Sequence, residues 1–126
     1  MNKAILIKEN LGYNFLQLEG TYFPCDDLYI QLLHDLFTEG YRGEELRQII
    51  DDDQVEGVSF NTVYLNKEDE TISLGSHFDK QDRTFEISKT HLFELIDKWA
   101  ELAYHVKPPK IIITRDGEKF TIDAGQ

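Results

Sequence analysis

The single cysteine of the chain, Cys25, is the first candidate for chemistry because a thiol can act as a nucleophile. It precedes Asp26 and Asp27 at the predicted start of a helix. A helix N-terminus lowers the pKa of a nearby thiol, but two neighbouring carboxylates oppose that effect. A cysteine nucleophile also needs a base and an oxyanion site, and no recognisable motif supplies them. We therefore interpret Cys25 as a small residue before a helix and predict no catalytic residues.

Two segments carry groups that could bind a metal ion. His77 and Asp79 lie two residues apart, which places them on the same face of a strand, but no further ligands follow at a recognisable spacing. Residues 51–57 have the acidic character of a calcium loop. Val55 stands where an oxygen ligand is needed, and the turn glycine and terminal glutamate of such a loop are missing. The sequence therefore predicts no metal, no cofactor and no enzymatic activity.

Charge is the strongest chemical feature of the chain. There are 24 Asp and Glu against 13 Lys and Arg, which gives a net charge of −11. Such a charge repels phosphate backbones and anionic membranes, so we expect neither nucleic acid nor membrane to be a partner. Residues 26–56 contain ten acidic residues and two basic ones, a net charge of −8. This segment is predicted to attract a basic protein, although a charged helical face can also serve only for solvation.

The predicted contact surface has three groups of residues. The leading group follows the second predicted helix and comprises Asp51, Asp52, Asp53 and Glu56. The supporting acidic residues are Glu44, Glu45, Glu68, Asp69 and Glu70. A tight complex also needs desolvated anchors, which are often aromatic, and the candidates nearest the acidic groups are Tyr41 and Tyr64.

The first half of the chain alternates strand-like and helix-like patterns. Residues 4–7 form an apolar run, and residues 15–19 alternate, which together predict a hairpin. Asp26 or Asp27 is predicted to cap a helix whose apolar residues recur at helical spacing up to Phe37. A second, shorter helix is predicted from Gly43 or Glu44 through Ile50.

The second half predicts a three-stranded antiparallel meander over residues 57–87, then a helix that begins at Ser88 or Thr90. The helix ends before residues 108–109, both proline, and residues 111–122 predict a hairpin around Asp116 and Gly117. The predicted fold class is α+β. We expect a single domain over residues 1–126, mainly an antiparallel sheet of about five to seven strands with about three helices.

The location predicted from the sequence is the cytoplasm. One cysteine cannot form an internal disulfide, which fits a reducing compartment. The apolar N-terminal run is too short for a signal peptide, and no run reaches the ~20 apolar residues of a membrane span.

The order of elements in residues 57–123 is similar to that of a known group of proteins. An acidic meander ends at residues 84–88, continues directly into a helix over residues 91–102, and is followed by a proline break and residues 111–117. This order resembles small bacterial immunity proteins, particularly those paired with contact-dependent growth-inhibition toxins and other polymorphic toxins. The resemblance implies a cytoplasmic protein that binds and neutralises a cognate toxin domain, often a nuclease with a basic surface. It assigns no role to any individual residue.

Three alternatives remain open from the sequence. The first is a phage-type inhibitor of a nucleic-acid-binding enzyme, which would work by the same electrostatic mechanism on a different target. The second is a small enzyme or ligand-binding domain with a pocket lined by His77, His91 or Cys25. The third is a non-catalytic adaptor within a larger complex. The sequence leaves the oligomeric state undetermined.

Overall fold

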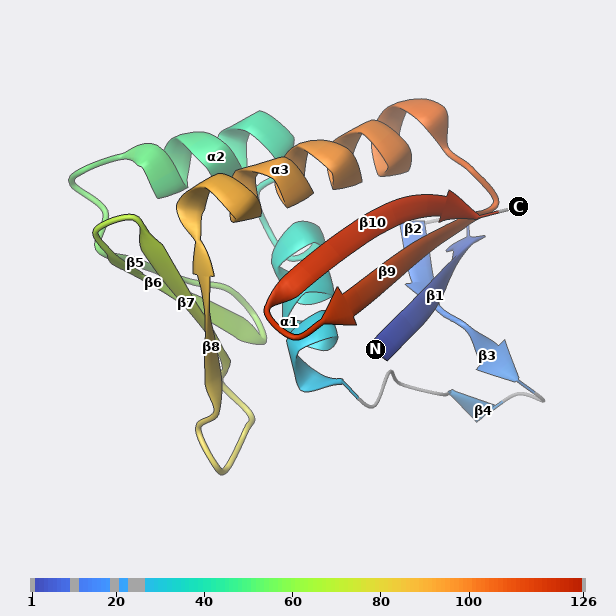
Figure 1. Cartoon of the computed structure of the whole chain (residues 1–126), viewed down its shortest axis with the longest axis horizontal. Coiled ribbons are helices and arrows are strands. Elements are labelled where there is room, and N and C mark those ends of the chain that lie inside the picture. Colours follow the sequence, from blue (N-terminus) through green and yellow to red (C-terminus); the bar gives the residue numbers. More distant parts are fainter. Residues whose placement is uncertain (1, 10–11, 19–20, 23–26, 126) are drawn as a thin grey trace. The chain divides into compact units, whose positions relative to one another are not determined.

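The computed structural model describes residues 2–9, 12–18, 21–22 and 27–125. Within them the chain forms three α-helices, one π-helical turn and ten strands, all of whose pairings are antiparallel (Figure 1). The predicted α+β class with three helices is confirmed. The strands do not form one sheet of five to seven strands; they divide into two four-stranded sheets and a two-stranded one.

Contacts along the chain separate it into two compact units. Unit 1 combines the two ends of the chain, residues 1–31 and 98–126, and unit 2 is the continuous segment 32–97. The boundaries fall inside helix α1 (Leu28–Thr38) and helix α3 (Lys89–Ala100).

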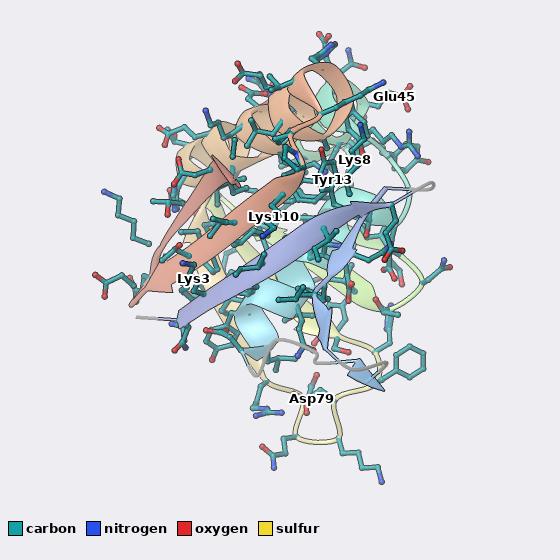
Figure 2. All side chains as sticks on the ribbon, turned by 90° about the vertical axis from the view of Figure 1, so that its right-hand side faces the viewer. Lys3, Lys8, Tyr13, Glu45, Asp79 and Lys110 are labelled. Carbon is teal, nitrogen blue, oxygen red and sulfur yellow. The ribbon has the colours of Figure 1, made fainter. Side chains whose placement is uncertain are left out.

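The main sheet of unit 1 has the strand order β10-β9-β1-β2. These strands are β1 (Asn2–Glu9), β2 (Gly12–Phe15), β9 (Lys110–Asp116) and β10 (Lys119–Gly125). Strands β3 (Gln17–Leu18) and β4 (Thr21–Tyr22) form a separate pair. Figure 2 shows Lys3, Lys8 and Lys110 along the main sheet. The predicted hairpin at Asp116 is confirmed, with Gly117 in the left-handed region at φ 63°.

Asp27 joins the start of α1 to the sheet of unit 1. Its Oδ1 accepts hydrogen bonds from the backbone N–H groups of Tyr29 and Ile30, at 2.9 and 3.3 Å, which confirms the predicted cap. Its Oδ2 accepts hydrogen bonds from Asn2 Nδ2 and Arg115 Nε, each at 2.6 Å. Burial raises the pKa of Asp27, but these hydrogen bonds together hold it below its ordinary value. Asp26 and Cys25 lie outside the described residues.

Unit 2 has a four-stranded sheet of order β5-β6-β7-β8 together with α2 (Gly43–Asp51) and the larger parts of α1 and α3. The strands are β5 (Gly57–Ser59), β6 (Val63–Glu68), β7 (Thr71–Ser76) and β8 (Thr84–Ser88). One face of this sheet is apolar, and the side chains of Leu65, Ile72 and Leu74 on it are fully buried. The opposite face carries Tyr64, Asn66 and Ser73, as expected from the alternation of side chains in a strand.

The predicted three-stranded meander of unit 2 is a four-stranded one. The alternating pattern that runs through residues 57–65 is interrupted by a turn at residues 60–62. Glu39, the residue directly after α1, accepts hydrogen bonds from Thr62 N at 2.9 Å and from Thr62 Oγ1 at 2.6 Å. Within the turn, Phe60 N donates to Val63 O at 2.8 Å. A residue far away in the sequence therefore stabilises a turn that the local pattern does not predict.

After Ala100 the last helix widens into the π-helical turn Glu101–Val106. The turn ends at Lys107, whose φ is 54° and whose N–H donates to Leu102 O at 2.8 Å. The helix therefore ends before Pro108, as predicted. Of the helices in the described part of the chain, none combines the length and apolar character needed to span a membrane.

Candidate protein-binding surface

The structure brings two of the predicted acidic groups together at one end of the unit 2 sheet. Gly57 pairs with Asn66, so Glu56 lies beside the end of β6, and Lys67 N donates to Glu56 O at 2.8 Å. The two-residue β6–β7 turn follows at the same end. We call this surface the acidic end, and its exposed carboxylates belong to Asp51, Asp52, Asp53, Glu56, Glu68, Asp69 and Glu70.

Lys67 and Lys89 are the two basic residues placed among these seven carboxylates. Lys89 Nζ lies 2.5 Å from Asp51 Oδ1, and Lys67 Nζ donates to the backbone oxygen of Asp52 at 2.7 Å. The hydrogen bond to Asp51, together with the charges of Asp51, Glu70 and Asp53, raises the pKa of Lys89. The same hydrogen bond and the charge of Lys89 lower the pKa of Asp51. The acidic end therefore keeps an excess of five negative charges.

The acidic end belongs to the unit that carries nearly all of the net charge. Unit 2 has 16 acidic and 6 basic residues, a net charge of −10, whereas unit 1 has 8 acidic and 7 basic residues. Arg47 of unit 2 is bound to Asp97 through two contacts of 3.1 Å, and its guanidinium lies 4.8 Å from the centre of the Phe93 ring. The charge of Arg47 is the smallest of the effects that lower the pKa of Asp51, after the hydrogen bond and charge of Lys89 and the charge of Lys67.

Glu44 and Glu45 do not join the acidic end. Both lie in the first turn of α2, while Asp51 ends that helix. Asp51 follows Glu44 by seven residues and Glu45 by six, which separates the two groups by about 10 Å along the helix axis. Carboxylates in a first turn stabilise a helix through its dipole, which gives Glu44 and Glu45 a structural role.

The predicted tyrosine anchors lie toward the other end of the unit 2 sheet. Tyr64 is four residues from Glu68 along β6, about 13 Å in an extended strand. Its hydroxyl donates to Asp82 Oδ1 at 2.8 Å and its ring lies 5.3 Å from that of His77. Tyr41 is 45% exposed and contacts the edge of Phe60 at 6.5 Å between ring centres. Neither tyrosine is therefore grouped with the seven carboxylates.

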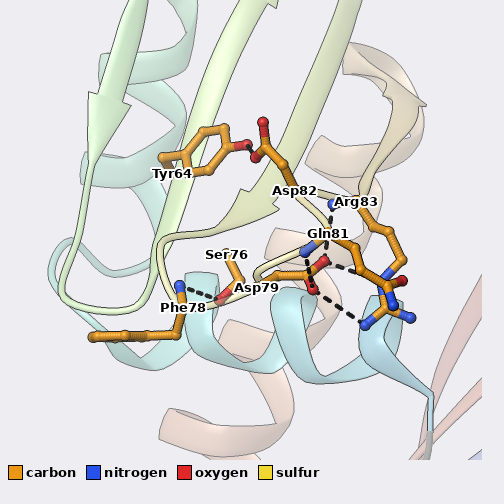
Figure 3. Close-up of polar contacts among 7 residues, drawn as sticks. All are labelled: Tyr64, Ser76, Phe78, Asp79, Gln81, Asp82 and Arg83. Atoms are coloured by element: carbon orange, nitrogen blue, oxygen red, sulfur yellow. Dashed lines mark hydrogen bonds and ion pairs between the residues drawn. The ribbon is translucent and has the colours of Figure 1, made fainter.

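The sequence predicts a turn over residues 79–83, whereas the structure has a longer β7–β8 loop over residues 77–83, which takes Phe78 out of the strand (Figure 3). Asp79 organises it, because its carboxylate accepts hydrogen bonds from Gln81 N, Arg83 N and the Arg83 guanidinium at 2.8–3.3 Å. These bonds, those from Arg83 first, lower the pKa of Asp79 to about 2. Phe78 stands beside this network with its side chain 74% exposed. The sequence feature that could have indicated this exposed side chain is the position of Phe78 beside the polar residues 79–83.

One contact on the outer face of the unit 2 sheet has the geometry of a nucleophile and a base. Ser59 Oγ lies 2.6 Å from His77 Nε2, within the range of an activated serine. Both side chains are exposed, so the pair lacks the water-excluded surroundings that strengthen catalytic electrostatics. His77 thus contacts Ser59 rather than joining Asp79, which is bound to Arg83. In the part of the chain that the structure describes, no three His, Cys, Asp or Glu side chains are grouped to hold a metal ion.

Comparison of the chain with protein-family models, with curated proteins and with solved structures found no match. The functional interpretation therefore depends on the residues of the chain itself.

Proposed function

We propose that the chain is an inhibitor of the immunity-protein type, which binds a basic toxin domain in the cytoplasm and blocks its nucleic-acid-binding surface. The observation that carries this proposal is the acidic end of unit 2, where seven exposed carboxylates from three segments meet only two lysines. A nuclease holds its substrate with Lys and Arg directed at phosphates. Carboxylates can occupy the same side chains through charge-assisted hydrogen bonds.

We place the partner at the acidic end because this arrangement of carboxylates lowers the stability of the fold, which a binding function would explain. Like charges held close together destabilise the folded state, and carboxylates at the C-terminal end of α2 oppose the helix dipole. The same field accelerates association with a basic protein by roughly 10–10³-fold. Steric cover of the toxin surface then completes the inhibition.

The test uses the protein domain encoded immediately upstream of this chain, because immunity genes follow their toxin genes. We expect that domain to be toxic when expressed alone in a bacterial host and harmless when co-expressed with this chain. Purified, the two should form a complex whose association rate falls steeply between 50 and 500 mM NaCl. An upstream product that is non-toxic, or that forms no complex, would contradict the proposed function.

Two variants with the same net charge locate the contact. Both remove three negative charges, the first at the acidic end and the second at exposed positions of unit 1. The first variant carries Asp51→Asn, Asp52→Asn and Asp53→Asn, and the second Glu101→Gln, Glu118→Gln and Asp123→Asn. At 50 mM NaCl we expect the first to slow association about tenfold and the second less than twofold. Equal effects would show that total charge matters and the acidic end does not.

A second candidate function, ester hydrolysis, is favoured only by the Ser59–His77 contact. It is tested with p-nitrophenyl acetate. A serine nucleophile should give a burst of product that Ser59→Ala and His77→Ala both abolish. Under the inhibitor proposal, the wild-type chain and both variants should hydrolyse the ester at the same slow rate.

A further inference from the structure

Phe78 has the most exposed large apolar side chain in the described part of the chain. It is 74% exposed, compared with 57% for Val106 and 45% for Tyr41. A single exposed apolar residue is common on protein surfaces and needs no explanation by itself. What distinguishes Phe78 is the structure of the loop that holds it.

The loop around Phe78 is longer and more ordered than its connecting role requires. The β6–β7 turn of the same sheet needs two residues, whereas the β7–β8 loop uses seven. Phe78 N donates to Ser76 Oγ at 3.1 Å, and on its other side Asp82 N donates to Asp79 O at 3.0 Å. Asp79, with a side chain only 7% exposed, is bound to Arg83 (Figure 3). An anchor held in this way loses little conformational entropy when a partner covers it.

Other aromatic side chains lie at the same end of the unit 2 sheet. His77 N donates to Thr62 O at 2.9 Å, which ties the loop to the turn that contains Phe60. Tyr41 contacts Phe60, and Tyr64 contacts His77 and binds Asp82. We call this surface the aromatic end, comprising Tyr41, Phe60, Tyr64, His77 and Phe78.

The charges of unit 2 decide between the two simplest occupants of the aromatic end. A second copy of the chain would bring a second unit of charge −10 against the first, and the repulsion opposes that contact. The carboxylates of Asp35 and Glu39 both contact Thr62 beside the loop, at 3.0 and 2.6 Å. Since Arg83 is paired with Asp79, Lys80 remains the main opposing charge of the loop. A basic protein fits this surface better than a second copy.

We propose that Phe78 is the anchor of the partner interface and inserts into an apolar pocket bordered by Lys and Arg on the basic partner. This inference rests on the proposed function and adds a second contact to it. The acidic end sets how fast the partner arrives, because its field acts over distance. Phe78 sets how long the partner stays, because its burial is lost only when the complex separates.

The test measures the kinetics of the complex between this chain and the domain encoded upstream. Phe78→Ala should raise the dissociation rate about 30-fold and change the association rate less than threefold. Val106→Ala, which trims another exposed apolar side chain, is the matched control and should change neither rate. Asp79→Asn keeps the ring but weakens its support, and should raise the dissociation rate by a smaller factor. Because Phe78 is exposed, its removal should leave the thermal unfolding curve unchanged.

The outcomes separate the anchor from the proposed function. If the wild-type complex forms and Phe78→Ala dissociates at the wild-type rate, the anchor is wrong and the inhibitor function stands. If the upstream domain does not bind at all, both are overturned. Sedimentation of the chain alone in 0.5 M NaCl tests the other occupant, since a dimer that Phe78→Ala disrupts would show that a second copy covers Phe78.

Discussion

Asp27 of unit 1 and the acidic end of unit 2 hold carboxylates in different surroundings. In unit 1 Asp27 is 7% exposed and accepts four hydrogen bonds, one of them from Arg115. In unit 2 the seven carboxylates of the acidic end are exposed and share two lysines. Unit 1 is also nearly neutral, at −1, while unit 2 carries −10.

This difference separates charge that holds a fold from charge that remains available to a partner. A buried carboxylate must be paired, because an unpaired one loses its hydration without compensation. An exposed cluster has no such requirement, and it contributes repulsion instead of stability. The following changes test whether the two units differ in this way.

The largest effect is expected at the buried ion pair of unit 1. Arg115→Ala leaves Asp27 buried without its charged partner and should lower the free energy of unfolding in urea by about 3 kcal/mol. Arg47→Ala breaks an ion pair of unit 2 whose side chains are 41% and 55% exposed, and should cost under about 1 kcal/mol. Equal losses of unfolding free energy in the two variants would show that the buried and the exposed ion pair contribute alike to stability.

The next effect has the opposite sign and lies at the acidic end. Asp52→Asn with Asp53→Asn removes repulsion and two charges that oppose the dipole of α2, so unfolding free energy should rise by about 1 kcal/mol. Asn at position 52 can keep the hydrogen bond from Gln54 N. Urea denaturation of this variant beside Glu118→Gln, an exposed change in unit 1, measures the difference. A loss of stability at the acidic end would show that its charges support the fold.

A smaller loss is expected at the other end of α2. Glu44→Gln with Glu45→Gln removes two carboxylates from the first helical turn and should lower the unfolding free energy by about 0.5 kcal/mol. The association rate with the partner should change less than it does in the variant of residues 51–53. If association slows as much as in the variant of residues 51–53, Glu44 and Glu45 belong to the contact surface, as the sequence predicts.

The smallest effect is local to the β7–β8 loop and depends on pH. The pKa of Asp79 is lowered from 3.8 to about 2, so its ionised form favours the ordered loop. That contribution is fully present above pH 3.8 and is lost as the pH falls through about 2. The NMR signal of the Arg83 N–H should report this transition. In Asp79→Asn it should be absent, and a transition that persists there would assign it to another group.

Local patterns were enough to predict most elements of the fold. The strand at residues 4–7, the cap at Asp27 and the hairpin at Asp116 are all confirmed, because each depends on neighbours in sequence. The turn at residues 60–62 depends on Glu39, 23 residues before Thr62, and the pairing of Asp27 with Arg115 spans 88 residues. No local pattern contains those contacts, so the fourth strand and the buried ion pair were missed.

The candidate surface was predictable in composition but not in arrangement. Clustering of acidic residues identified residues 51–56 and 68–70 separately, and the strand register then joined them. The same register placed Tyr64 toward the opposite end, since distance along a strand separates residues that look close in sequence. The turn at residues 79–83 was predicted, but the order of the loop around Phe78 was not, because that order comes from hydrogen bonds to the Asp79 side chain, which alternation of apolar residues does not reveal.

The split of unit 1 between the two ends of the chain has a consequence for synthesis on the ribosome. Strand β1 pairs with β9, which is translated about 100 residues later, a delay of roughly 5–20 s. During that time the whole of unit 2 has emerged and can fold, while β1 has β2 as its only partner in the final main sheet. Until β9 is available, one edge of the apolar strand β1 therefore stays without the strand that covers it in the folded protein.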